Sequence, residues 1–180
     1  RQSPITRALY GYFGYETAAL FQPRLAQAIP ASSAESCLVL AGTVIVFDHL
    51  YNRLTQLSLG EHRALSHAPL HGAEEPSIGE VSRTPDQAAY MKGVEHIKEL
   101  LHDGEAIQVV LSSQASAEFH GDAFMLYRRM RSINPSPYMF FMRLPEVTLF
   151  GSSPELMVRC TDGKLQLSPI AGTRRRGRDD

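Results

Sequence analysis

The sequence has little net charge, few cysteines and no long apolar run, and each absence excludes a class of function. The formal net charge of the 180 residues is -1, so the chain has no general attraction for polyanions, and we expect neither nucleic acid nor membrane as a partner. The two cysteines, Cys37 and Cys160, allow at most one disulfide, and we expect both to be reduced in a cytoplasmic protein. No apolar run is long enough to span a membrane, and the first residues lack the apolar stretch of a secretion signal.

The composition that remains is typical of a globular protein. Hydrophobic residues make up 43% of the chain and charged residues 21%, so we expect a sizeable buried core. The chain does not begin with Met, and we expect it to be one incomplete domain of a longer protein. We predict amino-terminal strands and a helix of the sheet core over 1–59, a surface loop or linker over 60–83, and a central portion over 84–180.

The first part has the pattern of short strands. Residues 10–15 predict a strand whose interleaved glycines allow close packing of its backbone, most simply against a neighbouring helix, and residues 16–25 predict a short helix. The run over 37–48 is nearly continuous in apolar residues and rich in Val and Ile. We therefore predict a strand buried on both faces, paired with a half-exposed strand over 54–59.

A long helix follows the loop. Thr84 is predicted as its cap, with Pro85 at the first helical position and Gln87 completing a capping box, and Gly104 fits a left-handed stop. A second helix is predicted from a cap at Asp122 to about residue 132.

Strands are predicted around and after these helices. Residues 106–111 predict a strand that places Gln108 among apolar neighbours. Two hairpins are then predicted, with strands over 138–143 and 147–150 and over 156–160 and 164–167, the second turning at Asp162-Gly163. The sequence thus predicts an α+β fold with antiparallel strands in two facing sheets and helices outside.

Four short motifs, in this order and spacing, resemble the chorismate-utilising enzymes, most closely the anthranilate synthase component I family. They are QVVLS at 108–112, NPSPYMFF at 134–141, GSSPE at 151–155 and PIAGTR at 169–174, with weaker similarity at GYFGYE, 11–16. Members of that family are far longer, so the chain resembles a fragment of one. The resemblance implies the chorismate-binding fold and the conversion of chorismate, with ammonia from glutamine, to anthranilate and pyruvate in tryptophan biosynthesis.

Glu155 is the leading candidate for a catalytic acid. It follows Pro154 at the mouth of a predicted strand, where apolar neighbours would favour the protonated carboxyl that a general acid needs. The spacing alone fits a turn residue equally well. The resemblance implies that Glu155 protonates the departing ring hydroxyl of chorismate.

Two further positions separate branches of the family that this chain resembles. Isochorismate and salicylate synthases have a lysine base at the position of Gln108, and aminodeoxychorismate synthases have a lysine amine at the position of Ala171. Gln108 and Ala171 therefore imply direct attack by ammonia, with Gln108 in the catalytic site. Taken without the resemblance, Gln108 would merely satisfy backbone groups. The substrate contacts implied are Ala171, Gly172 and Thr173.

The resemblance also implies regulation and partners. Tryptophan would inhibit by binding at Asn134, Pro135, Ser136, Pro137, Tyr138 and Met139, although this segment on its own also fits the start of a core strand. A glutamine amidotransferase, as subunit or fused domain, would supply ammonia. Mg²⁺ would be held by residues outside these 180, with no metal site in this chain, and we expect the chain alone to be inactive.

Other functions fit part of the pattern. Aminodeoxyisochorismate synthase and isochorismate synthase are alternatives within the same family, and the first of them would share Gln108 and Ala171. An alternative of another class is a non-catalytic regulatory module that binds an amino acid.

Overall fold

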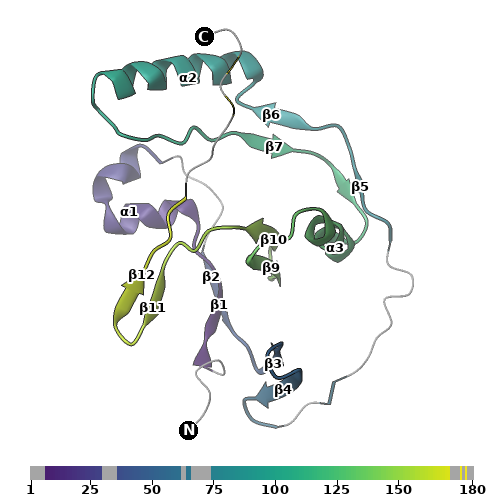
Figure 1. The fold of residues 1–180 in the computed structure, drawn as a ribbon. Coiled ribbons are helices and arrows are strands. Elements are labelled where there is room, and N and C mark those ends of the chain that lie inside the picture. The colour runs from purple at the N-terminus through teal and green to yellow at the C-terminus, as the bar shows by residue number, and fades with distance from the viewer. Residues whose placement is uncertain are drawn as a thin grey trace. The chain divides into compact units, whose positions relative to one another are not determined.

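The computed structural model describes residues 7–29, 36–61, 64–65, 74–170, 175 and 177, and its elements are labelled in Figure 1. The first elements are β1 (Leu9–Tyr12), η2 (Tyr15–Thr17), α1 (Ala18–Phe21), η3 (Pro23–Gln27), β2 (Cys37–Leu40), β3 (Thr43–Asp48) and β4 (Arg53–Ser58). They are followed by β5 (Ser77–Ile78), β6 (Ser82–Thr84), α2 (Gln87–His102), β7 (Gln114–Ser116), β8 (Phe119–His120), α3 (Ala123–Ile133), β9 (Tyr138–Arg143), β10 (Thr148–Ser153), β11 (Arg159–Thr161) and β12 (Lys164–Gln166).

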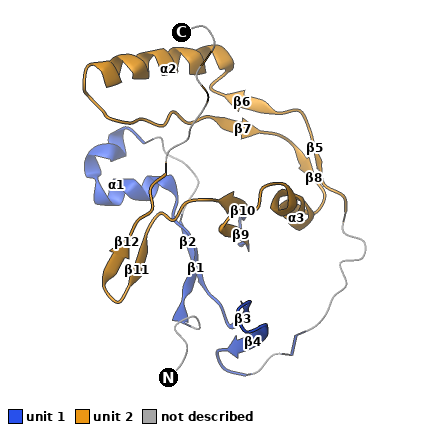
Figure 2. Ribbon diagram, in the orientation of Figure 1, with its two compact units in different colours: residues 1–69, 142–149 blue, residues 70–141, 150–180 orange. Residues whose placement is uncertain are grey.

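The chain divides into two compact units (Figure 2). Unit 1 comprises Arg1–Pro69 and Met142–Leu149, and unit 2 comprises Leu70–Phe141 and Phe150–Asp180. Separate helices and antiparallel strands confirm the predicted α+β class. The sequence predicted two larger facing sheets. Within the described residues each strand instead has a single pairing partner, so the strands form six two-stranded sheets. The strands β5 and β6 lie at the end of the 60–83 segment that was expected to be a loop.

In unit 1, β1 pairs with β2 in antiparallel register from Leu9↔Leu40 to Tyr12↔Cys37. A side chain at Gly11 would collide with the Cys37 carbonyl, so the close approach comes from the partner strand β2 and not from a helix as predicted. The helix predicted over 16–25 is instead three short turns, η2, α1 and η3. The break comes at Gln22, which precedes a proline and has φ -130° and ψ 82°, outside the helical region.

The strands β3 and β4 confirm the predicted pairing. Their register runs from Thr43↔Ser58 to Asp48↔Arg53. The connecting turn is built by Asp48, whose Oδ1 accepts hydrogen bonds of 3.1 Å from the amides of Leu50 and Tyr51. The single strand predicted over 37–48 is divided after Leu40, because β2 and β3 pair with different partners.

Burial differs from the sequence prediction. Leu40 in β2 is 57% exposed and Phe47 in β3 is 65% exposed, so the strand predicted to be buried on both faces is not. No hydrophobic side chain in the described ranges is classed as buried, and the sizeable core expected from composition is therefore absent from them. Over residues 37–48 the β-branched and apolar pattern predicted strands correctly, but it carries no information on what covers them.

In unit 2, α2 begins at a cap other than the predicted one. The Asp86 carboxylate accepts a hydrogen bond of 2.8 Å from the Ala89 amide, so Asp86, and not Thr84, caps the helix. The predicted stop is confirmed, since Gly104 has φ +80°. The amides of Gly104 and Glu105 donate to carbonyls of the last turn at 3.3 and 3.0 Å, which completes a Schellman motif.

The strand predicted over 106–111 is wrong. These residues form no strand, because no described strand lies alongside them to accept and donate the backbone hydrogen bonds. Ile107 and Val110 are exposed, at 102% and 82%. The segment is fixed against α2 at its end, where the Tyr90 hydroxyl donates to the Leu111 carbonyl at 3.4 Å and the Leu111 side chain lies over Gly93.

The helix α3 begins as predicted, at Asp122, whose Oδ1 accepts a hydrogen bond of 2.8 Å from the Phe124 amide. One face of the helix carries an aromatic cluster, made by Phe124 and Tyr127 with Phe141 of β9 and Phe150 of β10. Phe141 is its centre, at 5.1 Å from Phe124, 5.5 Å from Tyr127 and 6.0 Å from Phe150 between ring centroids. Such edge and offset contacts stabilise packing beyond the area they cover.

The two predicted hairpins are confirmed as β9–β10 and β11–β12. In the second, Asp162 has φ 50° and Gly163 has φ 75°, which are the left-handed conformations expected of an Asp-Gly turn. Among the helices of the described residues, none has the length and apolar character needed to cross a bilayer.

Candidate functional site

Two of the sequence motifs meet at the end of β10, in unit 2. The Ser136 hydroxyl donates to the Ser153 carbonyl at 2.8 Å, and the Ser152 hydroxyl donates to the Asn134 carbonyl at 2.5 Å. The Ser136 and Ser152 hydroxyl oxygens lie 2.9 Å apart. The small polar side chains of β10 therefore hold the 134–136 segment, immediately before β9, against the strand that leads to Glu155.

Glu155 joins a third motif to this arrangement. Its amide donates to Ser153 Oγ at 3.3 Å, which fixes the turn after β10. Its carboxylate Oε1 accepts a long hydrogen bond of 3.4 Å from the Ile170 amide, the second residue of the 169–174 motif. The GSSPE segment thus meets Ile170, the last described residue of the 169–174 motif, at the Glu155 carboxylate, although Glu155 and Ile170 are 15 residues apart in the sequence.

The surroundings of Glu155 are not those expected from the sequence. The side chain is exposed, so the apolar enclosure predicted around it is absent from the described residues. β10 ends at Ser153, so Pro154 and Glu155 lie outside the strand. The Glu155 carboxyl group is accessible, and the Ile170 amide donates one hydrogen bond to it.

Of the other predicted catalytic and substrate-binding residues, only Gln108 is described, and no hydrogen bond joins it to Glu155. Gln108 is exposed in the irregular segment after α2 and makes no hydrogen bond to a residue within the described ranges. Ala171, Gly172 and Thr173 lie outside the described residues. The predicted tryptophan segment is placed as a unit: Tyr138 and Met139 begin β9, and Asn134 and Ser136 are held by the serines of β10.

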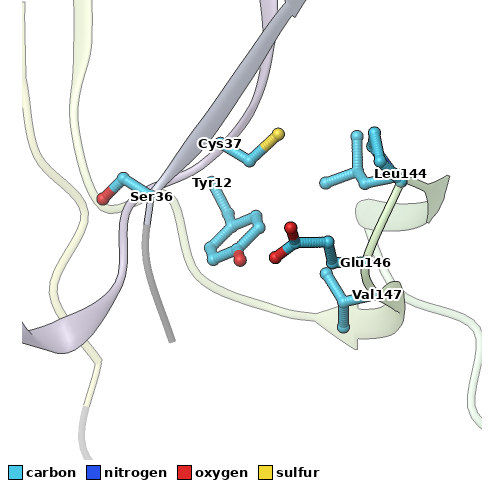
Figure 3. Close-up of a pocket in the computed structure, with 7 residues that line it drawn as sticks. Tyr12, Ser36, Cys37, Leu144, Glu146 and Val147 are labelled. Carbon is cyan, nitrogen blue, oxygen red and sulfur yellow. The ribbon is translucent and has the colours of Figure 1, made fainter. Parts of the chain in front are cut away.

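Unit 1 contains a cavity of about 200 Å³ that was not predicted from the sequence (Figure 3). The Tyr12 ring and the Glu146 carboxylate lie near one another in it, with the Cys37 thiol beside them. Its walls are Tyr12, Ser36, Cys37, Leu144, Pro145, Glu146 and Val147. These residues come from β1, the start of β2 and the β9–β10 turn. Of them only Tyr12 belongs to a motif named above, GYFGYE at 11–16, and none is a predicted site residue.

Comparison with known proteins identifies the family. The whole chain, residues 1–180, matches the family model described as chorismate binding enzyme. The chain belongs to this family. It is 32% identical to anthranilate synthase component 1 of Bacillus subtilis (strain 168), covering 98% of this chain and 41% of that protein. It is 36% identical to anthranilate synthase component 1 of Methanothermobacter marburgensis, covering 96% of this chain and 38% of that protein.

A solved structure shares the fold. The crystal structure of anthranilate synthase component I from Streptococcus pneumoniae TIGR4 superposes with a TM-score of 0.77, at 23% identity, over 92% of this chain and 43% of that one. The chain therefore has the fold of this chorismate-binding enzyme over the matched region. It spans about 40% of the length of the curated relatives that it matches.

The family resemblance implies Mg²⁺, and the described side chains do not fit it. In the ranges that the structure describes, no three His, Cys, Asp or Glu side chains gather closely enough to hold a metal ion. Mg²⁺ favours carboxylate and water oxygens in near-octahedral geometry, which a single exposed carboxylate such as Glu155 does not supply. Consequently no step of the chemistry below is assigned to a metal.

Proposed function

We propose that this chain is part of an anthranilate synthase component I and carries the acid that the reaction needs, Glu155. The whole protein would act as a lyase that converts chorismate and ammonia to anthranilate, pyruvate and water. The family match and the relatives' names support this proposal. The observation that carries it is the hydrogen bond from the Ile170 amide to Glu155 Oε1, because Ile170 immediately precedes the residues proposed to contact the substrate.

The reaction proceeds in two balanced steps. First, ammonia forms a C–N bond to the ring while the ring hydroxyl leaves as water, taking its proton from Glu155, and the product is 2-amino-2-deoxyisochorismate. Second, the C–O bond between the ring and the enolpyruvyl group breaks and a ring proton moves to the methylene carbon of that group, so that pyruvate leaves and the ring becomes aromatic anthranilate. An accessible carboxyl held at one oxygen suits the first step, because the other oxygen is available to the leaving group.

The choice of nucleophile follows from Gln108 and Ala171. An uncharged amide at position 108 is not a base for activating water, which argues against an isochorismate synthase. A methyl group at position 171 has no amine to attack the ring. Ammonia therefore comes from outside the chain, and we propose a glutamine amidotransferase, separate or fused, as its source. We further propose that the protein is cytoplasmic, that it serves tryptophan biosynthesis, and that Mg²⁺ ligands lie outside these residues.

Feedback inhibition by tryptophan is the proposed role of the 134–139 segment. The hydroxyls of Ser136 and Ser152, and the carbonyl of Asn134, form a fixed polar group at the end of β10. Tyr138, two residues after Ser136 in the sequence, is 36% exposed at the start of β9 and has an aromatic ring. This combination suits the ammonium and indole parts of tryptophan better than it suits chorismate, which has no ammonium group.

Product analysis tests the proposal. We define a hybrid in which residues 1–180 replace the matched region of the Bacillus subtilis relative, so that Glu155, Gln108 and Ala171 all come from this chain. With chorismate, Mg²⁺ and ammonia, the hybrid is expected to release anthranilate and pyruvate in equal amounts, and the 180-residue chain alone to release neither.

Each other product has a definite meaning. An amino product that retains its pyruvyl group would indicate aminodeoxyisochorismate synthase, and isochorismate without nitrogen incorporation would indicate isochorismate synthase. Tryptophan binding by the 180-residue chain alone, combined with no turnover by the hybrid, would indicate a regulatory module. Any of these three results contradicts the proposed function.

A further inference from the structure

The cavity in unit 1 is not used by the proposed function. Its volume is about 200 Å³. For comparison, a closed apolar cavity of about 150 Å³ is sufficient to bind benzene. The cavity in unit 1 therefore has room for a small organic molecule of roughly ten non-hydrogen atoms.

Two separate elements fix the walls of this cavity. Tyr12 and Cys37 are opposite one another in the antiparallel register of β1 and β2, so their side chains lie on the same face of the pair. The Leu144 amide donates to the Val147 carbonyl at 2.9 Å, which closes the turn that carries Glu146. Both walls are thus held by backbone hydrogen bonds, and a ligand does not have to order them.

Three polar side chains meet in the cavity. Figure 3 shows the Tyr12 ring and the Glu146 carboxylate close together, with the Cys37 thiol beside them. In the part of the chain that the structure describes, none of the ion pairs includes Glu146, and Cys37 is in no disulfide. The Glu146 side chain is exposed, so a ligand can reach its carboxylate from solvent.

The charge of the lining selects a cation. Glu146 supplies a carboxylate, and no lysine, arginine or histidine is among the described residues that line the cavity. An ammonium group at this carboxylate would also lie near the Tyr12 ring, and an aromatic face within about 6 Å attracts a cation. A carboxylate on the ligand would have no basic partner in the lining and would be repelled by Glu146. The cavity therefore favours an amine over an amino acid.

We propose that this cavity binds a small primary amine that carries no carboxylate group. The ammonium group lies between the Glu146 carboxylate and the Tyr12 ring, and the hydrocarbon part contacts Leu144 and Val147, which form an apolar wall. The lining shares no residue with the predicted catalytic, substrate and tryptophan positions. This inference therefore goes beyond the proposed function and holds whether or not the proposed reaction is correct.

A matched series of ligands tests the chemical class. 2-Phenylethylamine has an ammonium group, 2-phenylethanol has the same ring and chain without the charge, and L-phenylalanine adds a carboxylate to the amine. Each is titrated into the hybrid by calorimetry, with excess tryptophan present to fill the proposed inhibitor site. We expect 2-phenylethylamine to bind with a Kd of about 1 mM or below and the other two at least about tenfold more weakly. No binding of the amine, or equal binding of either other compound, contradicts the proposal.

Two substitutions and a control test the residues. Glu146→Gln keeps the shape of an exposed side chain and removes its charge, so we expect the Kd of 2-phenylethylamine to rise at least about tenfold. Tyr12→Leu removes the aromatic face and is expected to raise the Kd about threefold. Glu61→Gln, at an exposed glutamate of unit 1 outside the lining, is the matched control and is expected to leave the Kd unchanged. An unchanged Kd in Glu146→Gln contradicts the proposal.

Alkylation of the cysteines locates the ligand without any substitution. Cys37 lines the cavity, and Cys160 is exposed in β11, outside the lining. The hybrid and the 180-residue chain are labelled with iodoacetamide, and each cysteine is followed by peptide mass spectrometry. We expect 2-phenylethylamine at about ten times its Kd to slow the labelling of Cys37 at least about threefold and to leave Cys160 unchanged.

Two labelling results contradict the proposal. The first is a Cys37 that the amine protects in neither the hybrid nor the 180-residue chain, and the second is equal slowing at Cys37 and Cys160. Neither the titrations nor the labelling depends on chorismate turnover, so failure here is distinct from failure of the proposed function.

Discussion

Replacing Gly121 by alanine tests the local geometry of unit 2 most sharply. Gly121 has φ +98° and connects β8 to the cap of α3. A Cβ at this position would lie 2.6 Å from the Glu75 carbonyl oxygen and 3.0 Å from Pro76 Cα, both of them backbone atoms. An unstrained carbon–oxygen contact is about 3.3 Å or more, so the 74–76 segment has to move by roughly 0.7 Å. That movement stretches the 3.2 Å hydrogen bond from the Asp122 amide to the Glu74 carbonyl.

The expected loss of stability in Gly121→Ala has two parts, backbone strain and steric overlap, and the same substitution at Gly104 measures the strain alone. Left-handed backbone with a side chain costs about 1 kcal/mol, and a close-packed overlap adds about 2 kcal/mol, so Gly121→Ala is expected to cost about 3 kcal/mol. Gly104 also has a positive φ, of +80°, but a Cβ there would meet nothing within 4 Å. Gly104→Ala is therefore expected to cost about 1 kcal/mol, and the difference measures the overlap alone.

Thermal unfolding of the hybrid, followed by circular dichroism, measures both variants. We expect the midpoint to fall by about 6 °C for Gly121→Ala and by about 2 °C for Gly104→Ala. Hydrogen exchange of the Phe124 amide is expected to accelerate in Gly121→Ala alone, because that amide donates to the Asp122 cap beside the displaced segment. Equal losses of stability in the two variants would refute the proposed contact between Gly121 and the 74–76 backbone.

Three further predictions concern a cap, the aromatic cluster and regulation. In urea titrations Asp86→Ala is expected to destabilise the hybrid by about 1 kcal/mol and Thr84→Ala by much less, because the Asp86 carboxylate accepts the hydrogen bond from the Ala89 amide. A larger loss in Thr84→Ala would indicate that Thr84 is the cap. Phe141→Ala is expected to lower the free energy of unfolding by about 3 kcal/mol in the same titration, and Phe47→Ala, at an exposed position, by less than about 1 kcal/mol. Similar losses in the two variants would show that the aromatic cluster does not stabilise the fold. Ser152→Ala is expected to raise the tryptophan concentration for half-inhibition of the hybrid about tenfold, because the Asn134 carbonyl loses its donor, and unchanged inhibition would remove the 134–139 segment from the proposed site.

Local features of the fold were predictable because their physical cause lies within a few residues. Asp162 and Gly163 both have positive φ, and an Asp-Gly pair predicts this conformation from the sequence alone. The cap at Asp122 and the stop at Gly104 are set by side-chain and backbone hydrogen bonds within one turn. The cap of α2 was misplaced by two residues, since Thr84 and Asp86 both suit that role and only the direction of the backbone decides between them.

Features that depend on distant residues were not predictable. The 106–111 segment has the composition of a strand, but a strand also needs a neighbour to complete its hydrogen bonds, and no described strand provides one. The prediction that residues 37–48 are buried on both faces was wrong for the same reason. An apolar pattern indicates that a strand needs to be covered, but it does not identify the segment that covers it. The approach of Ile170 to Glu155 joins residues that are distant in sequence, and the shared family motifs were the one signal that indicated it.

The central claim is that Glu155 supplies the proton for the departing ring hydroxyl. It is tested most directly by the rate of anthranilate formation from chorismate and ammonia, measured by fluorescence with the Glu155→Gln hybrid and with Glu118→Gln, an exposed glutamate of the same unit, as control. We expect Glu155→Gln to lose about 10²- to 10⁴-fold in kcat and Glu118→Gln to keep the rate of the unmodified hybrid. A Glu155→Gln hybrid that turns over within about threefold of the control would contradict the claim.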